Sequence, residues 1–190
     1  MQFCELVAAV RNTPLNVTIP ADWGQGRASF GGLVVALQYE AMRAHVSVER
    51  ALRSLAVSFV GPVAADVPIS FEVEVLREGR AVSQVVGRAV QNGQVMTLVQ
   101  ASFGASRESA VSVDSVPAPE MKAVAQCPLL PCIKGITPEF MGHLSMAWAV
   151  GALPFTGRGT REMGGWVRLA GEVQDEPLTE THLLALVDAW

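Results

Sequence analysis

Leu33-Val-Val-Ala-Leu-Gln-Tyr-Glu-Ala-Met-Arg-Ala-His45 is an apolar stretch that is long enough for about three helical turns. It follows a glycine-rich approach, Trp23-Gly-Gln-Gly-Arg-Ala-Ser-Phe-Gly-Gly32. The opening turns are apolar on every side, and the polar residues Gln38, Glu40, Arg43 and His45 come late. Because a helix that is apolar all round is normally buried, the stretch predicts a helix whose N-terminal half is wrapped by other structure.

Four runs rich in β-branched residues follow the predicted helix, at 52–60, 67–77, 80–91 and 95–103. Gly61-Pro62 ends the first run, and Asn92-Gly93 between the third and fourth is typical of a type I′ hairpin turn. We expect one or two short strands before the helix as well. This order of elements predicts an α+β unit in which a single helix lies across a curved antiparallel sheet, which is the hotdog fold.

The periodic pattern fades between residues 106 and 138, where five of the 11 prolines lie. After this connector, the sequence predicts strands over 146–153 and 166–170, and a helix over 179–190 with Thr179 or Thr181 as its N-cap. The order strand, loop and apolar helix thus recurs about 149 positions later, as a duplicated unit requires.

We therefore expect a tandem double hotdog with an incomplete second unit. Its parts are an N-terminal hotdog over 1–105, a proline-rich connector over 106–138, and the start of a second hotdog over 139–190. The second unit would stop after the beginning of its central helix.

Composition and charge exclude several functional classes. Half of the residues are apolar and 17% are charged, which is typical of a packed globular protein, and a net charge of -4 disfavours nucleic acid as a partner. The segment from Met1 to Val10 lacks a basic leader, and no apolar run reaches membrane-spanning length, so we predict a cytoplasmic protein without a membrane partner. The spacing of the histidines and cysteines suits no metal site, and we expect no cofactor.

Three motifs carry a resemblance to a known family: Phe30-Gly-Gly-Leu-Val-Val35, Ser58-Phe-Val-Gly-Pro-Val63 and Leu183-Leu-Ala-Leu-Val-Asp188. With them the chain resembles the type II acyl-CoA thioesterases, in which two hotdogs are fused. The resemblance implies acyl-CoA as the substrate, and a catalytic aspartate on the second central helix that falls on Asp188. Tyr39 is the counterpart of Asp188 in the first half.

Two departures from the family accompany this resemblance. Its members hold the attacking water with a threonine and a glutamine further along the second hotdog, and neither position is expected in a sequence that stops at Trp190. Leu33 also stands where many members carry glutamine after the paired glycines.

Hydrolysis of a thioester needs a positioned water, a base and hydrogen-bond donors for the carbonyl oxygen. Asp188 follows a mostly apolar helical segment, so it is either the base or merely the first exposed position of that helix. Gly31 and Gly32 either open the N–H groups of a helix start to the thioester carbonyl or permit tight packing. Together with Phe30 and Tyr39, they are the candidate substrate-binding residues.

Two other functions remain open. The same fold serves enoyl-thioester hydratases and dehydratases, although no histidine lies near the first helix start, where such enzymes carry one. The absence of the threonine and glutamine also allows a non-catalytic module that binds acyl-CoA or serves assembly. In either case, exposed sheet edges favour a homodimer or a higher homo-oligomer.

Overall fold

The computed structural model describes residues 1–153, 156–157, 159, 161–171 and 177–190. Its main element is a five-stranded antiparallel sheet with the strand order β1-β5-β6-β7-β4. The strands are β1 (Val17–Thr18), β4 (Arg50–Phe59), β5 (Pro68–Glu78), β6 (Val82–Gln91) and β7 (Gln94–Ala105). The four long strands confirm the four predicted runs. Asn92 and Gly93 both have positive φ angles, 50° and 73°, as the predicted type I′ turn requires.

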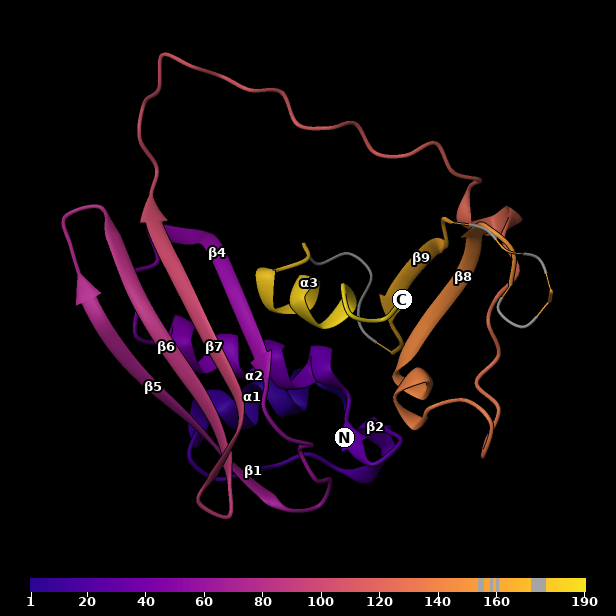
Figure 1. The fold of residues 1–190 in the computed structure, drawn as a ribbon, viewed down its shortest axis with the longest axis horizontal. Coiled ribbons are helices and arrows are strands. Elements are labelled where there is room, and N and C mark those ends of the chain that lie inside the picture. Colours follow the sequence, from indigo (N-terminus) through magenta and orange to yellow (C-terminus); the bar gives the residue numbers. More distant parts are fainter. Residues whose placement is uncertain (154–155, 158, 160, 172–176) are drawn as a thin grey trace.

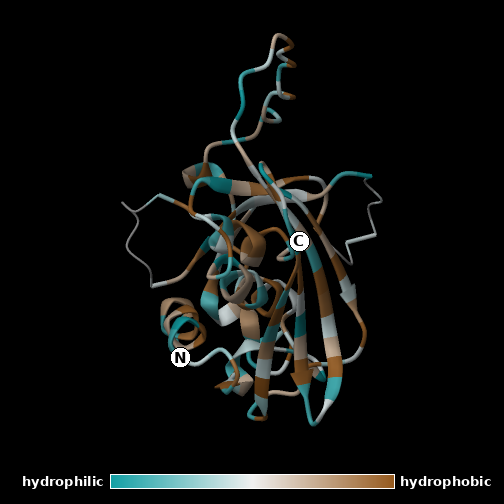
Figure 2. Ribbon diagram, turned by 90° about the vertical axis from the view of Figure 1, so that its left-hand side faces the viewer, coloured by the Kyte–Doolittle hydropathy of each residue, from teal (hydrophilic) through white to brown (hydrophobic). Residues whose placement is uncertain are grey.

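Helix α2 (Gly31–Arg43) lies against the inner face of this sheet. Every residue from 32 to 42 is buried, which confirms that the helix is wrapped by other structure. It begins and ends two residues earlier than predicted. Alternate residues of the strands point towards it, and Figure 2 shows the resulting alternation of hydrophobic and hydrophilic residues along the strands.

An N-terminal helix, α1 (Phe3–Asn12), was not among the predicted elements. Its buried residues recur at helical spacing, so one apolar stripe attaches it to the core: Phe3, Leu6, Val7 and Val10. The Arg11 side chain donates a hydrogen bond to Glu40 Oε1 at 2.6 Å, and Thr181 Oγ1 donates one to Glu40 Oε2 at 2.7 Å. The buried Glu40 carboxylate therefore connects α1 and α2 with the C-terminal part of the chain.

The C-terminal part contains the hairpin of β8 (Leu144–Val150) and β9 (Gly164–Leu169), followed by helix α3 (Glu180–Leu186). Figure 1 shows α3 between this hairpin and the five-stranded sheet, with the segment after β7 forming an extended arc between the two parts. The Thr179 side chain caps α3 by accepting a hydrogen bond from the His182 N–H, which confirms one of the two predicted N-caps. The helix ends at Leu186, whereas the prediction extended it to residue 190. Positions 154–155, 158, 160 and 172–176 of the predicted second unit lie outside the described residues.

Aromatic stacking joins the two parts below the helices. Two 3-10 helices contact each other there, η1 (Ala21–Trp23) and η3 (Glu139–His143). A third 3-10 helix, η2 (Val124–Gln126), lies in the connector. The rings of Trp23 and His143 stack with centroids 4.0 Å apart, and those of Phe30 and Phe140 at 4.1 Å. Within the described part of the chain, no helix combines the length and the hydrophobicity that crossing a membrane requires.

Candidate active site

Helices α2 and α3 pack against each other in antiparallel directions. Glu40, late in α2, contacts Thr181 at the start of α3, while Gly32, early in α2, lies against Ala185 near the end of α3. A Cβ atom on Gly32 would stand 2.6 Å from the carbonyl oxygen of Ala185, too close for any side chain. The absence of a side chain at Gly32 thus allows the two helices to approach closely, which supports the packing interpretation at this position.

Gly31 lies one residue earlier and faces different neighbours. A Cβ atom there would stand 2.9 Å from Oδ2 of Asp188 and 3.1 Å from Cζ of Phe59. The fold therefore brings Gly31 and Asp188 together. Asp188 occupies the turn after α3 rather than the helix itself, and it is exposed to solvent.

A cavity of about 410 Å³ opens at this point. Its walls come from the short hairpin of β2 (Gly24–Gln25) and β3 (Ala28–Ser29), the start of α2, the end of β4 with residues 60–63, and the start of β7. Asp188 completes the lining. Segments that are far apart in the sequence therefore form one site, whose walls are partly polar and partly apolar.

The start of α2 forms part of the cavity wall through Gly31 and Val34. The first N–H groups of an α-helix have no partner within the helix, and Phe30 provides no side-chain cap. Gly31 lines the cavity without a side chain, so its backbone can be approached closely. The positive end of the helix dipole attracts an anionic oxygen, which can belong to a ligand or to the carboxylate of Asp188 itself.

Phe30 and Tyr39 lie apart from the cavity. Phe30 is fully buried against Phe140, and neither Phe30 nor Tyr39 is among the residues that line the cavity. The Tyr39 ring lies 6.0 Å from that of Phe103, and its hydroxyl has no hydrogen-bond partner among the described residues. Burial, reinforced by the nearby charge of Glu180, raises the pKa of Tyr39 to about 12. A contact of Phe30 or Tyr39 with substrate stays a prediction.

Two polar residues of the cavity were not recognised from the sequence. Ser29 and Thr97 both line it, with relative exposures of 5% and 0%, and neither hydroxyl has a hydrogen-bond partner in the described structure. A signal for Thr97 was present, because it precedes the inward-facing Val99 and Ala101 at the two-residue spacing of a strand. Across the described ranges, no group of histidine, cysteine and carboxylate side chains is arranged to hold a metal ion.

Comparison with known sequences identifies two domains of one family. The acyl-CoA thioesterase N-terminal domain matches residues 19–104, and the acyl-CoA thioesterase C-terminal domain matches residues 113–190. Acyl-CoA thioesterase 2 of Haemophilus influenzae is 38% identical over 77 residues, which represent 40% of this chain and 27% of that protein.

Solved structures confirm the predicted α+β hotdog fold. A hot dog protein of unknown function from Alicyclobacillus acidocaldarius superposes with a TM-score of 0.77 and 23% identity, over 92% of this chain and 63% of that one. An acyl-CoA thioesterase II from Mycobacterium marinum superposes with a TM-score of 0.65 and 21% identity, over 92% and 62% of the two chains. The chain thus spans less than two-thirds of the length of these relatives. Since the two family domains together match most of its sequence, this chain belongs to the acyl-CoA thioesterase family.

Proposed function

We propose that this chain hydrolyses acyl-CoA thioesters to a free acid and coenzyme A, with Asp188 as the general base. Membership of the thioesterase family supports the reaction class. The proposal is carried by one structural observation, the approach of the Asp188 carboxylate to Gly31 at the N-terminal end of α2, in the wall of a cavity.

In the proposed reaction, the thioester carbonyl oxygen lies at the start of α2 and accepts a hydrogen bond from the Gly31 N–H. Asp188 takes a proton from a water molecule, and the water oxygen attacks the carbonyl carbon. The tetrahedral intermediate then collapses, the carbon–sulfur bond breaks, and the coenzyme A thiolate leaves and takes up the proton. This route requires no covalent nucleophile.

The site has an exposed side and a buried side, which suits a substrate whose two parts, on either side of the thioester bond, differ in polarity. Asp188 is exposed, whereas Val34 and Val63 are buried residues of the cavity lining. Coenzyme A, which carries charged phosphates, then remains on the solvent side of Asp188. The acyl group enters the cavity and contacts its apolar walls.

The test is thiol release from a panel of acyl-CoAs by the full-length protein and its Asp188→Asn variant. Asparagine keeps the size of the side chain and removes its basicity, so we expect kcat to fall by about 10²–10⁴-fold, the usual contribution of general-base catalysis. Asp66→Asn is the matched control, because Asp66 is exposed in a turn and is not part of the cavity lining. Full activity of Asp188→Asn would refute the assignment.

The two other functions predict different outcomes of the same assay. A hydratase or dehydratase would change the enoyl chromophore without thiol release, but no histidine is among the cavity residues in the described part of the chain. A non-catalytic module would bind acyl-CoA without converting it.

We also propose that the protein forms homo-oligomers. Strand β4 is an edge of the five-stranded sheet, and an edge strand presents unpaired N–H and C=O groups to another chain. Sedimentation equilibrium of the full-length protein checks this proposal, and a monomer at all concentrations contradicts it.

A further inference from the structure

A buried hydrogen bond connects α2 with the first turn of α3. Thr181 Oγ1 donates it to Glu40 Oε2 at 2.7 Å, and the two residues are 5% and 9% exposed. Glu40 Oε1 accepts a second hydrogen bond, from Arg11 Nε at 2.6 Å, so the carboxylate is held from two sides. Burial of a carboxylate costs free energy even when the group is paired, and an apolar pair of similar volume often packs as well. The presence of Glu40 in this interface therefore calls for a reason other than packing.

The close contact at the other end of the two helices has no directional component. Gly32 lies against the backbone of Ala185 and has no side chain that could interlock with α3. Helix α3 is also short, with seven residues, so it depends on its neighbours for its position as well as its stability. A hydrogen bond is directional, and a single buried one can fix the register of one helix on another. The bond between Thr181 and Glu40 has this property.

Thr181 lies on the same face of α3 as Asp188. Asp188 follows Thr181 by seven residues, which is two helical turns, and Ala185 lies on the same face between them. Val187 keeps helical φ and ψ angles, -66° and -24°, so the helical path continues up to Asp188. The separation along the helix axis is about 10 Å. A rotation or tilt of α3 at Thr181 therefore moves the Asp188 carboxylate relative to Gly31.

We propose that Thr181 and Glu40 are positioning residues for thioester hydrolysis, because their hydrogen bond fixes the rotation of α3 at which Asp188 faces the start of α2. Neither residue lines the cavity at Gly31, so both act through Asp188 and not on the substrate. The inference rests on the proposed function for the role of Asp188 as the base. Loss of the hydrogen bond then lowers kcat and leaves KM nearly unchanged.

Two substitutions of Thr181 test this role in the full-length protein. Thr181→Val removes the hydroxyl and keeps the shape of the side chain, whereas Thr181→Ser keeps the hydroxyl. With an acyl-CoA that the wild type hydrolyses, we expect Thr181→Val to lower kcat by about 10- to 100-fold, the effect of displacing a catalytic group by about 1 Å. Thr181→Ser should retain most of the wild-type kcat. A wild-type kcat in Thr181→Val would overturn the inference.

Ile69→Val controls for a general loss of stability. Ile69 is 1% exposed, belongs to β5, and pairs with Val17 at the edge of the sheet that is opposite β4. Its truncation leaves a small cavity in the core and keeps the hydrogen bond between Thr181 and Glu40. Ile69→Val and Thr181→Val should both lower the midpoint of urea unfolding, but only Thr181→Val should lower kcat. An equal fall of kcat in both variants would show that Thr181 has a merely structural role.

The double variant Asp188→Asn/Thr181→Val tests whether Thr181 acts through Asp188. If Thr181 only places the base, its substitution should cause no further loss of kcat once the base has been removed. Losses that multiply in the double variant would show that Thr181 acts on another part of the site. That result overturns the inference and leaves the role of Asp188 intact.

Trp190 provides a readout that does not depend on activity. It follows Asp188 by two residues, and its ring lies edge-on to that of Trp148 with centroids 5.5 Å apart. In protein labelled with fluorotryptophan, the fluorine NMR resonance of Trp190 is identified by its absence from Trp190→Phe. It should shift in Thr181→Val and keep its position in Thr181→Ser.

This resonance also separates failure of the inference from failure of the proposed function. An unshifted Trp190 resonance in Thr181→Val overturns the inference, whatever the activity of Asp188→Asn. Full activity of Asp188→Asn refutes the proposed function instead. A shifted resonance would then still support control of the end of α3 by the hydrogen bond between Thr181 and Glu40.

Discussion

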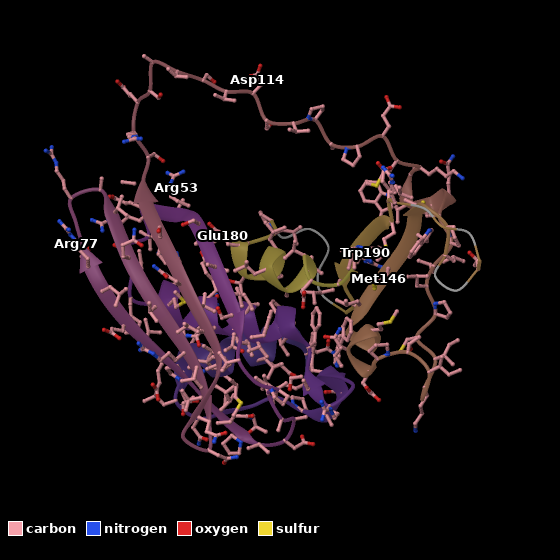
Figure 3. The ribbon with its side chains drawn as sticks, viewed as in Figure 1. Arg53, Arg77, Asp114, Met146, Glu180 and Trp190 are labelled. Atoms are coloured by element: carbon pink, nitrogen blue, oxygen red, sulfur yellow. The ribbon has the colours of Figure 1, made fainter. Side chains whose placement is uncertain are left out.

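Oδ2 of Asp188 lies 2.9 Å from the point where a Cβ atom would stand on Gly31, at one end of the antiparallel pair α2 and α3. At the other end of the pair, Tyr39 lies close enough to Glu180 for that charge to raise its pKa, and Figure 3 shows Glu180 at the end of α3 that is nearest the sheet. Tyr39 and Asp188 are 149 positions apart, and so are Gly31 and Glu180. The residues at the two ends of the helix pair therefore occupy equivalent positions in the two repeats: Gly31 corresponds to Glu180, and Tyr39 to Asp188. The residue types at these equivalent positions differ.

We expect Gly31→Ala to reduce thioesterase activity with little loss of stability. The new methyl group would stand in the space of the Asp188 carboxylate and the Phe59 ring. Asp188 lies in an exposed turn, so it can move away at small cost, but the base is then misplaced. A shift of about 1 Å lowers turnover by about 10- to 100-fold. The measurements are kcat from thiol release and the midpoint of urea unfolding.

Gly164→Ala is the matched control for this substitution. Gly164 belongs to strand β9, and nothing lies within 4 Å of the position that its Cβ atom would occupy. Its variant should retain wild-type kcat. Wild-type turnover by Gly31→Ala would contradict the placement of Asp188 at the start of α2.

Gly32→Ala should have the opposite effect to Gly31→Ala: it should lower the free energy of unfolding before it affects thioesterase activity. Its Cβ atom would stand 2.6 Å from the backbone oxygen of Ala185, and a backbone carbonyl cannot rotate away as a side chain can. Helices α2 and α3 must separate, at a cost of about 1–3 kcal/mol that the better helix propensity of alanine offsets only in part. Urea unfolding measures the loss. A stability equal to that of the wild type would show that the two helices are not closely packed in solution.

The five-stranded sheet and α2 could be predicted because their signals are local. The two-residue alternation and turns such as Asn92-Gly93 define the strands, and the run after Gly32 defines the helix. The stripe of α1 was equally readable, since Phe3, Leu6, Val7 and Val10 follow helical spacing.

The candidate site could be predicted only in part, because it depends on contacts between distant segments. A resemblance identified Asp188, but its position beyond α3 and its approach to Gly31 follow from how two helices pack. The hydroxyls of Ser29 and Thr97 are unpaired because none of their neighbours in the folded chain supplies a hydrogen-bond partner. Those neighbours come from distant segments, so the sequence alone does not identify them. Stacking of His143 on Trp23 is equally a product of the folded chain.

Tyr39 should titrate far above the range of an exposed tyrosine. It is the one tyrosine of the chain, so phenolate absorbance reports on it alone. Burial raises its pKa from 10.0 to about 12. Its neutral form therefore contributes stability that is fully present below pH 10 and is lost as the pH rises towards 12.

The measurement is a phenolate titration of the native protein, with the denatured protein as the reference. The denatured chain should ionise near pH 10 and the native protein near pH 12. Tyr39→Phe should make the unfolding free energy less sensitive to pH over this interval than in the wild type. It should not lower stability at neutral pH, because the hydroxyl that it removes has no hydrogen-bond partner among the described residues. Ionisation of the native protein near pH 10 would show instead that solvent reaches the Tyr39 hydroxyl.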